Sequence, residues 1–65
     1  MEEMRKQIGK RFRVAIENYQ DPTKLFFHNG VLKEVDQHGI WLETEKGTIY
    51  LSFEMIRQAT YDETR

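Results

Sequence analysis

Basic residues near the N-terminus are the side chains whose number and spacing best suit contact with phosphate groups. Half of the lysines and arginines fall within the first thirteen positions, at Arg5, Lys6, Lys10, Arg11 and Arg13. The whole chain has a formal net charge of −1, so a surface that binds a polyanion has to be local. Lys10, Arg11 and Arg13 are therefore candidate phosphate contacts. The plain alternative is that they are solvated charges on an exposed strand.

A polar corner at Gln37 and His38 is the second place where binding chemistry is available. A neutral imidazole can stack on a nucleobase, and a protonated one can also meet a phosphate. Asp36 is expected to hold this corner by accepting hydrogen bonds from backbone N–H groups. A tight hairpin corner needs polar residues whatever its function, so this alternative stays open.

Catalytic and metal-binding arrangements are not indicated by the residue inventory. His28 and His38 are the only histidines, and the chain has no Cys, which leaves no zinc-binding pattern. Ser52 is the only serine, without the spacing of a Ser-His-Asp group, and no glycine-rich loop could hold a phosphate. We expect neither an enzyme nor a metal or cofactor site.

Hydrophobic periodicity predicts a short N-terminal helix followed by five short strands. Met1, Met4 and Ile8 would form one apolar stripe of the helix, and strict alternation marks the strands. A glycine at the change of apolar phase around Asn29-Gly30 predicts a bulge or sharp bend in the second strand. The expected elements are a helix at about 1–8, strands at 11–18, 24–35, 40–44, 49–53 and 56–60, and a polar tail at 62–65.

The same alternation assigns the large apolar side chains to the core or to the surface. Phe27 and Phe53, and with them Phe26, are expected in the core. Trp41 and Tyr50 point outward by strand phase. Trp41 either covers the helix or a neighbouring subunit, or it is a platform on which a base or partner stacks. Tyr50 is expected to be an interface aromatic.

The 65 residues allow one domain with a thin core. Without Cys the domain has no disulfide to stabilise it, so self-association is the expected supplement. No apolar run approaches the roughly 18 residues of a membrane span, and the N-terminus has no apolar signal core. We therefore expect no membrane partner and a cytoplasmic location.

A central segment resembles the first sequence motif of the Sm-like superfamily, which comprises the Sm and LSm proteins and the bacterial RNA chaperone Hfq. The matching residues are Gly30, Leu32, Val35, Asp36, Ile40 and Leu42. The sequence from Asp36 to Leu42 resembles the Hfq version of this motif more than the eukaryotic version. The resemblance covers about residues 4–61 and implies a strongly bent five-stranded antiparallel barrel of SH3-like or Sm-like type at about 11–61, preceded by the helix.

The resemblance also implies a ring of six or seven copies that binds single-stranded, U-rich or A-rich RNA without catalysis. In such rings the fourth strand of one copy pairs with the fifth strand of the next. The implied RNA contacts are Gln37 and His38 at the corner, and Lys10, Arg11 and Arg13 on the rim. The implied subunit interface consists of Ile49, Tyr50, Leu51, Ile56, Gln58 and Thr60.

Two other interpretations remain open. The ring could serve as a protein-interaction or scaffold module without RNA binding. Alternatively, the domain could be an SH3-like barrel that docks a peptide on Trp41 and Tyr50. The number of copies separates the SH3-like interpretation from the two ring interpretations. Binding of oligonucleotides then separates the scaffold from the RNA-binding ring.

Overall fold

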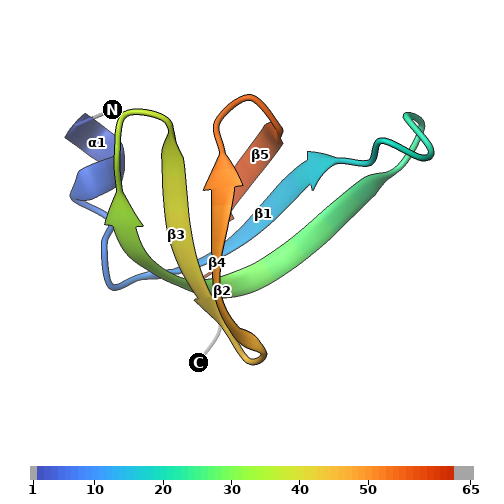
Figure 1. The fold of residues 1–65 in the computed structure, drawn as a ribbon. Helices are drawn as coiled ribbons and strands as arrows, with labels where there is room; N and C mark the ends of the chain where they lie inside the picture. The colour runs from blue at the N-terminus through green and yellow to red at the C-terminus, as the bar shows by residue number, and fades with distance from the viewer. Residues whose placement is uncertain (1, 63–65) are drawn as a thin grey trace.

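The structure is a computed structural model that describes residues 2–62, with side chains from residue 4 onward. It is one five-stranded antiparallel sheet preceded by a single helical turn, so the predicted mainly-β architecture is confirmed (Figure 1). The elements are α1 (Glu2–Arg5), β1 (Arg11–Glu17), β2 (Leu25–Val35), β3 (Gly39–Thr44), β4 (Gly47–Ser52) and β5 (Ile56–Tyr61).

The sheet is strongly curved but open, so the structure shows the five antiparallel strands but not the closed barrel that was predicted. Its strand order is β4-β3-β2-β1-β5, so β4 and β5 are its two edges, and within residues 2–62 they do not pair with each other. The hairpin of β1 and β2 projects to one side, whereas α1 lies at the opposite end, near the turn between β2 and β3 (Figure 1). One copy of the chain therefore leaves two strand edges without a backbone partner.

Gly30 permits the close approach of β2 and β3. A Cβ atom added there would collide with the backbone carbonyl of Glu43, so only glycine fits. The register shift between these strands falls between Leu32 and Glu34. The bulge therefore follows Gly30 rather than coinciding with it, which corrects the predicted position by a few residues.

The core lies on the concave face of the sheet. As predicted, Phe12, Val14 and Ile16 of β1 are buried, and Ile40 and Leu42 of β3 meet them there. Phe53 is partly buried and packs against this core, also as predicted. The complete set of buried apolar residues is Phe12, Val14, Ala15, Ile16, Leu32, Val35, Ile40, Leu42 and Leu51.

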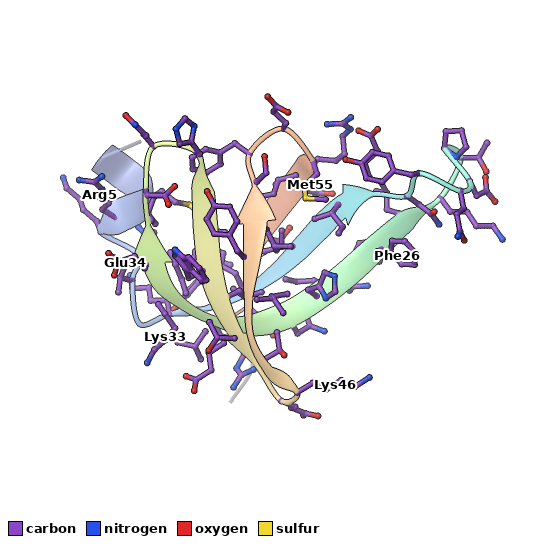
Figure 2. All side chains as sticks on the ribbon, viewed as in Figure 1. Arg5, Phe26, Lys33, Glu34, Lys46 and Met55 are labelled. Atoms are coloured by element: carbon purple, nitrogen blue, oxygen red, sulfur yellow. The ribbon has the colours of Figure 1, made fainter. Side chains whose placement is uncertain are left out.

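The prediction that Phe26 and Phe27 are core residues is wrong. Their side chains are 50% and 49% exposed. β2 pairs with β1 from Leu25 to Val31, but it pairs with β3 only from Val31 onward. The first half of β2 therefore projects beyond β3, and Phe26 lies on this projecting half (Figure 2).

The helix is shorter than the predicted 1–8. After Arg5 the chain continues in hydrogen-bonded turns to Gly9, which has a φ of +96°. The backbone at Gly9 and Lys10 is bound by Leu32, with N···O distances of 2.7 and 2.9 Å, so the chain must leave the helix early. Met4 packs against the core as expected, whereas Ile8 is exposed.

Residue 1 of the predicted helix and residues 63–65 of the predicted tail lie outside the described residues. Within the described range, no helix has the length and apolar character required to cross a membrane.

Candidate functional site

The predicted basic residues Arg11 and Arg13 lie on the convex face of β1. Strand alternation puts them opposite the buried side chains of Phe12 and Val14, and both arginines are exposed. Lys10, which precedes β1, is also exposed, and its Nζ lies 5.5 Å from the centre of the Tyr61 ring. The three cations are therefore accessible to a ligand. Both alternatives left open by the sequence, phosphate contacts and solvated charges, predict this exposure.

Arg13 lies against the face of an aromatic ring. Its guanidinium carbon is 4.4 Å from the centre of the Phe27 ring, within the range of a cation–π interaction. Phe27 is paired with Ala15 on β1, so both side chains share the convex face. Ala15 is buried, and its small side chain leaves room for the ring and the guanidinium to lie above it.

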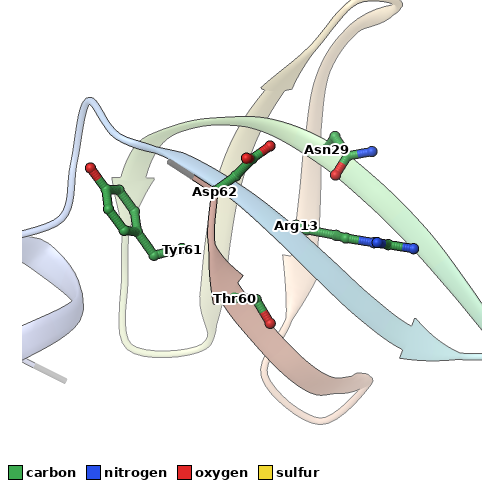
Figure 3. A pocket seen from close by; sticks show the side chains of 5 residues that line it. All are labelled: Arg13, Asn29, Thr60, Tyr61 and Asp62. Carbon is green, nitrogen blue, oxygen red and sulfur yellow. The ribbon is translucent and has the colours of Figure 1, made fainter. Parts of the chain in front are cut away.

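Shallow hollows surround this contact, and we call Arg11, Arg13, Phe27 and Asn29 together the convex β1–β2 face. One hollow lies between Arg11, Phe27, Asn29 and the β3–β4 turn at Lys46. A second is lined by Arg13, Asn29, Thr60, Tyr61 and Asp62 (Figure 3). A third is lined by Arg13, Ala15, Phe27, Gln58 and Thr60.

The chemistry of the convex β1–β2 face combines three kinds of group. Phe27 offers an exposed ring, Arg11 and Arg13 offer cations, and Asn29 offers an amide that both donates and accepts hydrogen bonds. Sequence reasoning missed Phe27 and Asn29 as site residues. The sequence carried no signal for them, because the register that places Phe27 beside Ala15 and the early end of β3 are seen only in the structure.

The polar corner forms as predicted. One carboxylate oxygen of Asp36, Oδ1, accepts hydrogen bonds from the N–H groups of His38 and Gly39, each at 2.8 Å. The Tyr50 hydroxyl donates a third hydrogen bond to the same oxygen, at 3.0 Å. Gln37 and His38 are exposed at the tip of the corner.

Electrostatics at the corner follow from these bonds. The hydrogen bond from the His38 backbone is the main cause that lowers the pKa of Asp36, and the bonds from Gly39 and Tyr50 act in the same direction. Desolvation, together with the bond to Asp36, raises the pKa of Tyr50. Asp36 is therefore an anion that fixes the corner, while the tip remains open to a ligand.

The structure does not bring the corner and the basic residues into one site. Gln37 and His38 lie in the turn that joins β2 and β3, whereas Arg11 and Arg13 lie on β1, next to the first half of β2. Among residues 2–62, no hydrogen bond or ion pair joins the two groups. They are separate candidate contacts.

The predicted interface residues all lie on the two edge strands. Ile49, Tyr50 and Leu51 belong to β4, and Ile56, Gln58 and Thr60 belong to β5. The side chain of Leu51 is buried in the core of its own chain, so this residue offers a neighbour its backbone only.

Arg57 on β5 is a cation that is already engaged. Its guanidinium forms an ion pair with the Glu17 carboxylate of β1 and donates to the backbone oxygen of Glu54. It does not belong with the cations that are available for a ligand. In residues 2–62 no three His, Asp or Glu side chains gather in a way that could hold a metal ion.

Comparison with protein-family models, with curated proteins and with solved structures found no match. The evidence for a function therefore comes from the geometry of the chain itself.

Proposed function

We propose that this chain is a non-catalytic, Sm-like protein that binds single-stranded RNA and works as a cyclic homo-oligomer. The observation that carries the RNA-binding part is the half-exposed Phe27 ring on the convex face, which contacts the Arg13 guanidinium and shares a hollow with Arg11 and Asn29. The resemblance of residues 30–42 to the Sm-like motif supports the same proposal.

The groups on the convex β1–β2 face match the parts of a single-stranded nucleotide. An aromatic ring stacks on a base of any sequence, and such stacking contributes about 1–3 kcal/mol per base. Arg11 and Arg13 supply charge-assisted hydrogen bonds to phosphate oxygens. Asn29 and the neighbouring Gln58 and Thr60 can exchange hydrogen bonds with base edges or 2′-hydroxyl groups.

A ring would repeat the local basic residues of each copy, although every copy also adds its net charge of −1. With a net charge of −1, one chain has no general attraction for RNA. A cyclic oligomer would repeat Arg11 and Arg13, with Lys10 beside them, once per subunit around a belt. The corner at Gln37 and His38 would supply a second contact in each copy.

The two open edges support the ring. Unpaired strand edges expose a row of N–H and C=O groups that natural proteins pair, cover or charge. The N–H of Asp62 donates to the carbonyl of Arg11 at 2.9 Å. Because successive N–H groups of a strand alternate in direction, those of Tyr61 and Ala59 point away from β1, toward the open edge of β5. A β4 strand from another copy is the partner we propose for them.

Anisotropy of fluorescently labelled oligo-U and oligo-A at two salt concentrations tests the RNA-binding part. We expect binding at low salt that weakens as salt rises, because phosphate contacts release counterions. The double change Arg11→Ala and Arg13→Ala should lower the affinity and flatten the salt dependence, whereas Lys33→Ala, which removes an exposed cation elsewhere on β2, should do neither. Absence of binding at low salt would refute the proposal.

A scaffold module without RNA binding is the second candidate. The observation that favours it is the exposed aromatic pair of Trp41 and Tyr50, which lies on β3 and β4 rather than on the strands that carry Arg11, Arg13 and Phe27. Oligomerisation without any RNA binding would support this candidate over the first.

A further inference from the structure

The outer surface of β3 and β4 carries a pair of exposed aromatic rings. Trp41 and Tyr50 face each other across the two strands, with ring centres 4.8 Å apart and a tilt of 55°. Their side chains remain 40% and 37% exposed. The hydrogen bond from the Tyr50 hydroxyl to Asp36 fixes the end of one ring, so the pair is a preorganised apolar surface.

Carboxylates surround this pair. Glu34 on β2 is the cross-strand neighbour of Trp41, and Glu43 is two residues beyond Trp41 on the same face of β3. Asp36 lies beside Tyr50. We call these three carboxylates and the two rings the acidic aromatic face.

One cation partly offsets these charges. Lys33 forms an ion pair with Glu43 at 3.5 Å, in which both side chains are about half exposed. Glu34, next to Lys33 at the far end of β2 (Figure 2), has no ion pair among the described residues. The acidic aromatic face therefore keeps a negative excess, in contrast to the arginines of the convex β1–β2 face.

We propose that the acidic aromatic face binds an arginine- or lysine-rich segment of a partner protein. A guanidinium or ammonium group lying on the Trp41 ring gains a cation–π interaction, and the aliphatic part of its side chain covers the apolar surface. Glu34 and Glu43 then offer charge-assisted hydrogen bonds to the same or the next cation. This inference goes beyond RNA binding and uses different residues.

Two other occupants fit the surface less well. RNA phosphates would be repelled by the three carboxylates that surround the rings. A neighbouring subunit paired through the strand edges would use the backbone of β4, and the rings project from the face of the sheet rather than from its edge. The face therefore remains accessible in the proposed ring.

The test uses Trp41, the only tryptophan of the chain, as its own fluorescent reporter. The full chain is titrated with an acetylated hexa-arginine amide at low and high salt, with hexa-glutamate as the opposite-charge probe. We expect a saturable change in Trp41 emission with hexa-arginine, weakened by salt, and none with hexa-glutamate.

Charge-neutral variants identify the residues responsible. The double change Glu34→Gln and Glu43→Gln should weaken hexa-arginine binding about 3- to 10-fold, as expected for two exposed charge pairs. Glu45→Gln is the matched control, because this exposed glutamate lines the hollow beside Arg11 instead, and it should bind as the unchanged chain does.

Four results would overturn the proposal: no emission change with hexa-arginine, an equal change with hexa-glutamate, equal weakening by Glu45→Gln, or saturable quenching of Trp41 by oligo-U. The first three do not depend on whether the chain binds RNA through Arg13 and Phe27. The fourth concerns RNA on the acidic aromatic face itself, and it counts only if the double change Arg11→Ala and Arg13→Ala leaves the quenching unchanged. The two proposals can therefore fail separately.

Discussion

The adjacent phenylalanines Phe26 and Phe27 provide a matched pair for testing the proposed RNA site. Their exposed fractions are nearly equal, 50% and 49%, but they lie on opposite faces of β2. Phe26 pairs with Ile16 on the concave side, and Phe27 pairs with Ala15 beneath Arg13 on the convex side. Phe27→Ala should impair RNA binding, and Phe26→Ala should not.

The expected magnitudes follow from exposure and stacking. Replacing a fully buried Phe by Ala costs about 3–5 kcal/mol of stability, so half-buried rings should cost about half of that in both variants. Loss of one base–aromatic stack removes about 1–3 kcal/mol of binding free energy, which corresponds to about a 5- to 150-fold higher Kd for Phe27→Ala. The two variants should therefore be equally destabilised but differ in affinity.

The assay combines urea unfolding with oligo-U and oligo-A anisotropy at one salt concentration, on samples whose oligomeric state has been checked by native mass spectrometry. The stacking role of Phe27 would be refuted if both variants lost affinity equally, or if Phe27→Ala bound RNA as tightly as the unchanged chain. A loss confined to Phe26→Ala would place the site on the concave side instead.

Three further predictions concern the strand contact at Gly30, the corner at Asp36 and the open edge of β5. Gly30→Ala forces a Cβ atom against the carbonyl of Glu43, so we expect a loss of about 1–3 kcal/mol in urea unfolding, and an unchanged midpoint would contradict the close approach of β2 and β3. Asp36 has a lowered pKa in the folded chain, so its stabilisation is complete above the unfolded value of about 3.9 and is lost as pH falls through the folded value. Asp36→Asn should remove the fall in stability that protonation of Asp36 causes at low pH. An acid-unfolding profile identical to that of the unchanged chain would argue against the stabilisation of the corner by this carboxylate. Ala59→Pro deletes an N–H on the open edge of β5 and should give smaller assemblies in native mass spectrometry, whereas Ala59→Ser, which keeps the N–H, should not; equal assembly of both variants would show that this edge is not paired.

Much of the fold could be predicted because alternation is a local property of the sequence. The inward positions of Phe12, Val14 and Ile16 follow from period-two burial, and the corner at Asp36 follows from the ability of an aspartate to accept backbone N–H bonds. These features depend on residues that are close in the chain.

The predictions that were wrong concern features that depend on distant parts of the chain. Phe26 and Phe27 have the apolar character of core residues, but their burial requires a third strand that reaches them, and β3 ends before it does. The helix after Arg5 yields to backbone hydrogen bonds between Gly9, Lys10 and the distant Leu32. Neither constraint is visible in local periodicity.

The same limit applies to the candidate site. Arg11 and Arg13 could be selected from the sequence as exposed cations, because they alternate with buried residues. Their aromatic partner could not be selected, because the register of β1 and β2 determines that Phe27 lies beneath Arg13. A binding surface made from neighbouring strands becomes recognisable only when their pairing is known.

The most direct test of the account is the mass of the assembly in native mass spectrometry. We predict six or seven copies of the 7.9 kDa chain, joined through the open edges of β4 and β5. A single folded copy at high concentration would contradict it, because the two edges would then be stable without a partner strand.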